Sequence, residues 1–198
     1  MKYWALVSLG VFALPIFAGV WEIDDAHTAA KFKIRHLMVS NVYGQITGAK
    51  GSLEMNDKDL TKTQGTVTLD VNTVNTANEK RDAHLKNEDF FDVSKHPTIT
   101  FQIKKVVKAA GGKWRMDGDL TMKGITKPIT LKEVELTPSI KDPWGATKRG
   151  LTGVTSLNRK DFGLTWNKQL DGGGMVIGDK VDIEVAMELK EKTDAAKN

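Results

Sequence analysis

The chain has 198 residues, a formal net charge of +4 and no cysteine. The missing cysteines exclude disulfides, thiol nucleophiles and thiolate metal sites. Charges of both signs are interspersed along the chain, which argues against a nucleic-acid partner.

The first 18 residues are typical of a secretory signal peptide. Lys2 is followed by an apolar run of about 15 residues, and small residues stand at Ala18 and Gly19. A membrane span needs roughly 20 apolar residues, so we expect cleavage near 18/19 and no membrane span in the mature chain. Residues 19–192 are then long enough for one domain with a sizeable core, and residues 193–198 are expected to form a flexible tail.

The first part of the mature chain alternates between apolar and polar residues, as half-buried strands do. From Ala30 to Met38 the alternation places Phe32, Ile34 and His36 on one face, and lysine and arginine on the other. Shorter runs with the same pattern follow at residues 42–46, 53–55 and 67–71. The last of these places Val67 and Leu69 on one face.

The segment from Asn78 to Asn87 is the best helix candidate. It lacks a broad apolar stripe, so we expect a short helix at the rim of the fold. An adjacent aromatic pair, Phe90 and Phe91, comes next. Pro97 then precedes a strand that has Ile99 and Phe101 on one face.

The remaining chain again reads as strands, at residues 114–122, 129–136, 151–157 and 181–189. Gly111 and Gly112 predict a hairpin turn, and residues 172–174 a flexible loop. The pattern amounts to eight or more strands and almost no helix, which fits a β-sandwich or a barrel. An eight-stranded barrel has room for one small ligand, but periodicity alone does not choose between the two folds.

An outer-membrane barrel also combines a signal peptide with alternating strands. Its apolar residues face lipid and its polar residues face the lumen. Here that would enclose Lys31, Lys33 and Arg35 in a narrow lumen, and burying such a row of charges is costly. A barrel in water, with its apolar face inward, is therefore the better interpretation.

Candidate catalytic groups are sparse. The histidines His27, His36, His84 and His96 are scattered, and no pair has metal-ligand spacing, so no metal site is predicted. The segment 81–84 (RDAH) resembles a charged active-site cluster, but no GxSxG motif accompanies it. We interpret it as a capped, solvated helix turn with an internal ion pair. An enzyme that uses His36 or His84 with Asp82 as acid–base groups is the alternative.

Several motifs together resemble the YceI-like family. They are RDAHL (81–85), FFD (90–92), HPTITF (96–101), GDLTMKGITKPITL (118–131), DPWG (142–145) and NRKDFGL (158–164), and DAHTAAKFKIRHLMVSNVYG near the start belongs with them. The resemblance covers nearly the whole chain after residue 19. It implies an all-β fold, a lipocalin-like antiparallel barrel of eight strands or slightly more with a short helix at the rim. It also implies a periplasmic protein that binds polyisoprenoid or other lipids without catalysis.

We therefore expect a lipid or isoprenoid partner with its tail in the lumen and no cofactor. Arg81 and His84 are candidates for its head group, and His36 could instead be a core histidine bonded to a backbone carbonyl. For the paired phenylalanines and the tryptophans a purely structural role stays open, as do a barrel filled by its own side chains and a homodimer. The expected ligand-binding residues are Phe32, Ile34, His36, Val67, Leu69, Phe90, Phe91, Ile99, Phe101, Leu120, Met122, Trp144, Leu157 and Trp166.

Overall fold

The computed structural model describes residues 19–56 and 59–192. The predicted signal peptide at 1–18 and the predicted tail at 193–198 lie outside the described residues. The described chain contains ten strands, one α-helix (α1, Glu79–Lys86) and four short 3-10 turns. The strands are β1 (Gly19–His36), β2 (Ser40–Ile46), β3 (Lys50–Met55), β4 (Gln64–Asp70), β5 (Thr98–Lys108), β6 (Trp114–Met122), β7 (Ile125–Leu136), β8 (Ile140–Lys141), β9 (Thr147–Asn158) and β10 (Ile177–Glu191).

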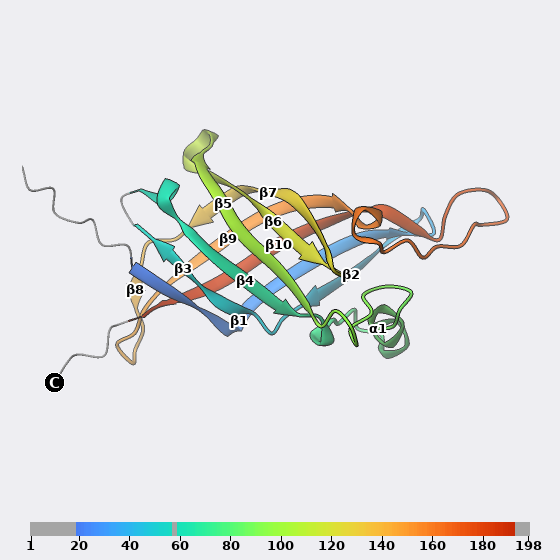
Figure 1. The fold of residues 1–198 in the computed structure, drawn as a ribbon, viewed down its shortest axis with the longest axis horizontal. Helices are drawn as coiled ribbons and strands as arrows, with labels where there is room; N and C mark the ends of the chain where they lie inside the picture. The colour runs from blue at the N-terminus through green and yellow to red at the C-terminus, as the bar shows by residue number, and fades with distance from the viewer. Residues whose placement is uncertain (1–18, 57–58, 193–198) are drawn as a thin grey trace, which may run out of the picture.

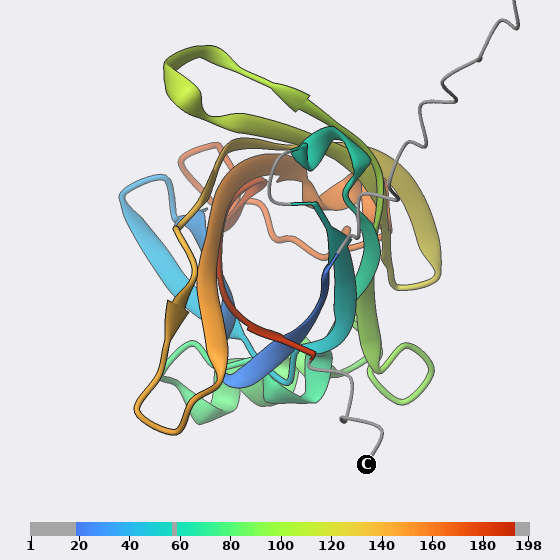
Figure 2. The ribbon, with the colours of Figure 1, turned by 90° about the vertical axis from the view of Figure 1, so that its left-hand side faces the viewer.

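Eight of these strands close into an antiparallel barrel (Figure 2). Their order around the ring is β1-β3-β4-β5-β6-β7-β9-β10, and β10 pairs with β1 along most of its length. β2 and β8 pair outside this ring, with β1 and β9 respectively. The predicted all-β barrel of eight strands is confirmed, and closure leaves the eight ring strands without a free edge between them.

β1 starts earlier and ends earlier than the sequence pattern predicts. Its first four residues pair with β3, and its last seven, Ala30–His36, pair with β2. A register shift between Asp24 and Ala29 separates the two parts. The predicted continuation to Met38 is wrong, because the chain turns after His36. The β1–β2 hairpin therefore forms an arm that runs towards the right-hand end of the barrel in Figure 1.

The short helix α1 lies at the same end of the barrel as this arm (Figure 1). The side chain of Asn78 caps it by accepting a hydrogen bond from the Arg81 backbone N–H at 3.0 Å, which satisfies one of the free donors of a helix start. None of its residues is fully buried. Asn75 and Gln45 exchange two backbone hydrogen bonds of 2.9 and 3.0 Å, so the segment leading to α1 runs beside β2. The predicted rim helix is thus found beside the arm.

The opposite end of the barrel is filled by its own side chains. Trp21 is buried there, and the guanidinium of Arg149 lies 4.9 Å from the centre of its ring. The other residues of this plug are at most 3% exposed, and they are Leu53, Met55, Val106, Met116, Val134, Leu151 and Leu189. Packing of this kind supplies the hydrophobic stabilisation that a chain without disulfides requires.

No helix in the described part of the chain is long and apolar enough to cross a membrane.

Candidate ligand-binding cavity

A cavity of about 470 Å³ occupies the barrel between the plug and α1. This volume falls within the range of roughly 300–1,000 Å³ that small-molecule sites occupy. None of the plug residues lines it, so the barrel is filled in one half and hollow in the other. Its apolar wall is made by inward-facing side chains of the barrel strands and β2, and includes Phe32, Val42, Val67, Leu69, Ile99, Phe101, Leu120, Ile129, Leu131, Leu157, Val181, Ile183 and Val185.

The structure brings nearly all of the predicted ligand-binding residues to this cavity. Strand alternation explains most of them, because residues two apart on a strand face the same side of the sheet. The lining includes Phe32, Ile34, His36, Val67, Leu69, Phe90, Phe91, Ile99, Phe101, Leu120, Met122, Leu157 and Trp166, and also Arg81 and His84. These predicted residues therefore line a single cavity.

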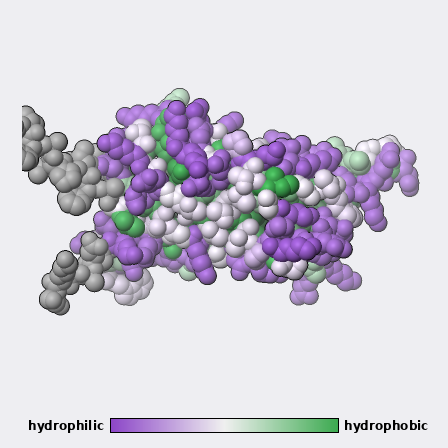
Figure 3. Space-filling view, in the orientation of Figure 1, coloured by the Kyte–Doolittle hydropathy of each residue, from purple (hydrophilic) through white to green (hydrophobic). Residues whose placement is uncertain are grey.

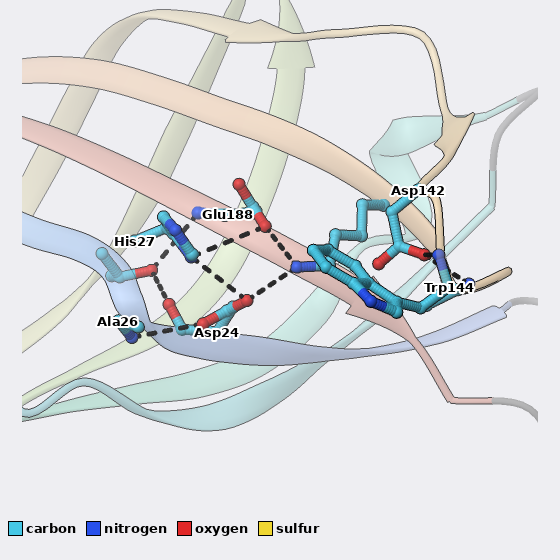
Figure 4. Close-up of polar contacts among 9 residues, drawn as sticks. Asp24, Ala26, His27, Asp142, Trp144 and Glu188 are labelled. Atoms are coloured by element: carbon cyan, nitrogen blue, oxygen red, sulfur yellow. Dashed lines mark hydrogen bonds and ion pairs between the residues drawn. The ribbon is translucent and has the colours of Figure 1, made fainter.

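Trp144 is the exception, and its prediction as a lining residue does not hold. Its side chain is 86% exposed and lies in the turn between β8 and β9, outside the cavity. Its backbone N–H donates a hydrogen bond of 2.9 Å to Asp142 Oδ1, which also accepts one of 2.8 Å from the Ala146 N–H (Figure 4). An aspartate that bonds the backbone ahead of it in this way makes a tight turn, and the turn directs the indole away from the lumen.

An aromatic cluster closes part of the cavity next to α1. The ring of His84 meets Phe90 and Trp166 edge-on, each at a centroid distance of 5.0 Å. Its Nε2 lies 2.8 Å from Asp89 Oδ2. Phe90 and Phe91 lie in the turn after α1 rather than at the start of a strand. Phe90 is buried while Phe91 is half-buried, so the pair both packs and lines the cavity.

No ion pair within the segment 81–84 is found among the described residues. The side chains of Arg81 and Asp82 both hold Thr76 instead. Arg81 donates from Nε to Thr76 Oγ1 and from Nη2 to Thr76 O, both at 2.8 Å, and Asp82 Oδ1 accepts from the Thr76 N–H at 2.9 Å. These bonds fix α1 against the segment beside β2. Asp82 of the alternative acid–base pair is thus bonded to Thr76, and the carboxylate nearest to His84 Nε2 is that of Asp89.

The charged residues of the cavity lining are all basic. Five lysines and arginines line it, and no aspartate or glutamate does so within residues 19–56 and 59–192. Three of them are exposed, one is half-buried and one is buried. Basic groups at the edge of an apolar cavity favour an anionic or electron-rich ligand group. The sequence interpretation proposed only Arg81 as a ligand contact, and it placed Lys31 and Arg35 on the polar face of their strand. The five basic residues are Lys31, Arg35, Lys80, Arg81 and Arg159.

Arg159 is the most buried of these cations, at 3% exposed. Its Nε donates to Gly178 O at 2.9 Å, and its Nη1 donates to Leu164 O and, at 2.9 Å, to Trp166 O. Burial lowers the pKa of this guanidinium, and the charge of Asp179 opposes that effect. Arg159 begins the 3-10 turn Arg159–Phe162 directly after β9, so strand alternation does not predict where its side chain points.

A second polar cluster lies away from the cavity lining (Figure 4). Ligand atoms of Asp24, His27 and Glu188 lie within 4.8 Å of one another, a set that could hold a metal ion. However, Lys148 Nζ lies 2.9 Å from Asp24 Oδ2 and 2.6 Å from Glu188 Oε1. The hydrogen bond from Lys148 lowers the pKa of Asp24, and the two carboxylates raise the pKa of Lys148. The lysine thus already supplies the positive charge that a cation would supply.

Proteins with a similar sequence or a similar fold are known. A model of the YceI-like domain matches residues 21–189. A protein of Pseudomonas aeruginosa (strain LESB58), called UPF0312 protein, is 39% identical over 149 residues, which are 74% of this chain and 77% of the relative. The crystal structure of the Campylobacter jejuni YCEI protein has 31% identity and a TM-score of 0.66, covering 81% of this chain and 91% of that one. A polyisoprenoid binding domain from Saccharophagus degradans, implicated in plant cell wall breakdown, shares the fold at 12% identity and a TM-score of 0.57, over 88% and 99% of the two chains.

Proposed function

Because this chain belongs to the YceI-like family, we propose that it is a non-enzymatic binding protein that holds an amphipathic lipid. The hydrocarbon tail occupies the barrel cavity, and the head group lies at the α1 end. The observation that carries the proposal is the half-hollow barrel, an apolar cavity of about 470 Å³ that ends on a packed plug. An apolar tail fits such a wall, whereas a polar ligand would lose its hydration there without finding partners.

The dimensions favour a long tail. Ile177 and Met187 of β10 both line the cavity and are ten residues apart. At ~3.3 Å per residue they span ~33 Å of strand, or ~25 Å along the axis of a barrel whose strands tilt by ~40°. Each buried CH₂ contributes about 0.8 kcal/mol, so ~20 carbons contribute roughly 16 kcal/mol, against an association cost of about 4–15 kcal/mol. Tail burial therefore sets the affinity.

The head group sets the orientation of the ligand. Arg81 and His84 line the cavity beside α1, and Lys80 and Arg35 line it with them. Basic groups suit a phosphate, a carboxylate or a quinone carbonyl, and of these four residues His84 already has an acidic partner in Asp89. The name of the Saccharophagus degradans domain points to a polyisoprenoid. We therefore favour an isoprenoid-like ligand of the polyprenyl or quinone type, with a fatty-acid-like one as the second choice.

We place the protein in the periplasm. The support is the sequence of residues 1–18, where one lysine precedes an apolar run that is too short for a comfortable membrane span. A carrier or store in that compartment would keep a long hydrocarbon tail out of water.

Native mass spectrometry after mild purification tests the proposal. We expect an excess mass that matches a long-chain lipid, and we expect delipidated protein to take up a polyprenol or a long-chain fatty acid from solution. A short-chain analogue with the same head group is the matched control, and it should bind far more weakly because fewer CH₂ groups are buried. A clean ligand-free mass together with no uptake of any long-chain lipid would rule the proposal out.

A further inference from the structure

The hairpin between β1 and β2 ends in an exposed apolar turn. Leu37, Met38 and Val39 are 39%, 55% and 75% exposed. The neighbouring loop adds Met175, which is also exposed. The two segments touch, because the Leu37 N–H donates to Val176 O at 2.7 Å. We call residues 37–39 and 175 the tip. In Figure 3, hydrophobic atoms show among hydrophilic ones at the right-hand end, where this hairpin lies.

The backbone of the turn does not call for these side chains. The Val39 N–H donates to His36 O at 3.1 Å and closes a turn whose central residues, Leu37 and Met38, have φ of 49° and 60°. Positive φ at both central positions is the geometry of a type I′ hairpin turn, which strongly favours Asn-Gly. Leucine and methionine are strained there and are not buried in return. Apolar residues that strain the backbone and stay exposed at one site indicate an interaction with another molecule.

The surroundings of the tip complement an anionic membrane surface. The chain carries no aspartate or glutamate between Asp25 and Glu54. Lys33 pairs with Asp182 of β10 at 3.3 Å and Lys31 lies opposite Glu184. Arg35, next to the tip, forms no ion pair within the described residues and donates from Nη2 to Met38 O at 2.8 Å. Tyr43 is 65% exposed on β2 and pairs across the strands with Lys33. On the neighbouring loop Lys168 offsets Asp171. Apolar residues at the end of an arm, with tyrosine and basic residues behind them, match the order of acyl chains and head groups in a bilayer.

The tip is continuous with the lining of the cavity. Arg35 and His36 precede it in the chain, Val176 and Ile177 follow Met175, and all four line the cavity. A lipid with a long tail resides in a bilayer and hardly dissolves in water. We propose that the tip inserts into the surface of a membrane containing anionic lipid and sets the α1 end of the cavity against it. The role of this docking in lipid exchange rests on the proposed function, whereas the docking of the tip itself does not.

Co-sedimentation with vesicles tests the docking. The experiment uses residues 19–198, which contain every strand and the helix of the described fold. The apolar residues 1–18 then cannot contribute to vesicle binding. We expect binding to vesicles of phosphatidylcholine with phosphatidylglycerol, weaker binding to phosphatidylcholine alone, and weakening by salt. The double substitution Leu37→Asn with Met38→Gly should reduce the affinity at least ~10-fold and should keep or raise the melting temperature, since it installs the preferred turn. Ile140→Asn, at an exposed apolar position on β8, is the matched control and should leave binding unchanged.

Three results would overturn the docking proposal. One is the absence of binding to either vesicle, and another is binding that the double substitution leaves intact. The third is a concentration-dependent dimer in wild type that the double substitution abolishes while vesicle binding stays unchanged. The tip would then pack against a second copy of the chain. Failure of the proposed function is separate, since a ligand-free protein that takes up no lipid can still sediment with vesicles.

Discussion

The ring of Phe32 lies across the backbone of Gly44, its partner on the neighbouring strand β2. A Cβ atom on Gly44 would come within 2.4 Å of Phe32 Cζ and 2.8 Å of Thr76 Cγ2. Glycine at this position therefore leaves room for the ring, which lines the cavity. The same residue also lets Thr76, which α1 holds by two side chains, approach the sheet.

We expect Gly44→Ala to push the Phe32 ring away from β2 and to lower the free energy of unfolding by about 1–3 kcal/mol, as overpacking does. Urea unfolding measures the change. Gly172→Ala is the control, because a Cβ there meets nothing within 4 Å, and it should stay within about 0.5 kcal/mol of wild type. Equal stabilities for the two variants would contradict this account of Gly44.

Arg159 should be required for the fold of the 159–178 segment. Its guanidinium donates to the backbone carbonyls of Gly178, Leu164 and Trp166. Arg159→Met leaves these carbonyls without that donor, at about 1–3 kcal/mol for each group that stays buried and unpaired. We expect a loss of roughly 3 kcal/mol or more in urea unfolding. Lys160→Met, at the exposed neighbour, should cost far less, and a comparable loss there would count against the specific role of Arg159.

The sequence predicts the faces of the strands better than their positions along the barrel. Alternation identifies Leu53 and Leu69 equally as inward-facing residues, yet Leu53 is part of the plug and Leu69 lines the cavity. The difference depends on register between strands, which local periodicity does not contain. The barrel itself was expected from the family resemblance, because alternation alone also fits a sandwich.

The errors have physical causes of a similar kind. Trp144 was assigned to the cavity as a large aromatic residue, but a turn built by Asp142 keeps it in solvent. An ion pair within the segment 81–84 was expected from proximity in the chain, whereas Arg81 and Asp82 both bond to Thr76, which precedes the helix. Arg159 was missed because it follows the last residue of β9, in the 3-10 turn Arg159–Phe162, where strand alternation no longer predicts the direction of a side chain.

The cluster of Lys148 with Asp24 and Glu188 should make stability depend on pH. The hydrogen bond from Lys148 lowers the pKa of Asp24 in the folded state. A carboxyl with a lowered pKa stabilises the fold above its unfolded-state pKa of about 3.9, and that stabilisation is lost as the pH falls through the folded-state pKa. Lys148→Met should therefore lower the melting temperature at neutral pH, and the difference from wild type should shrink in acid.

Thermal unfolding of both proteins between pH 7 and pH 2 measures this effect. Lys141→Met is the matched control, because Lys141 is exposed on β8 and forms no side-chain ion pair within the described residues. A difference between Lys148→Met and wild type that stays constant across this pH range would show that the lysine acts by packing and not by its charge.

Two valine-to-phenylalanine substitutions separate the inside of the barrel from the outside. Val185 on β10 lines the cavity, whereas Val154 on β9 is partly exposed and lies outside it. A phenylalanine at 185 takes space from the ligand. If it displaces about three CH₂ groups at ~0.8 kcal/mol each, affinity for a long-chain lipid falls roughly 50-fold. Val154→Phe should bind as wild type does. Titration of delipidated protein with a fluorescent long-chain lipid measures both, and equal affinities would mean that the tail does not enter the cavity.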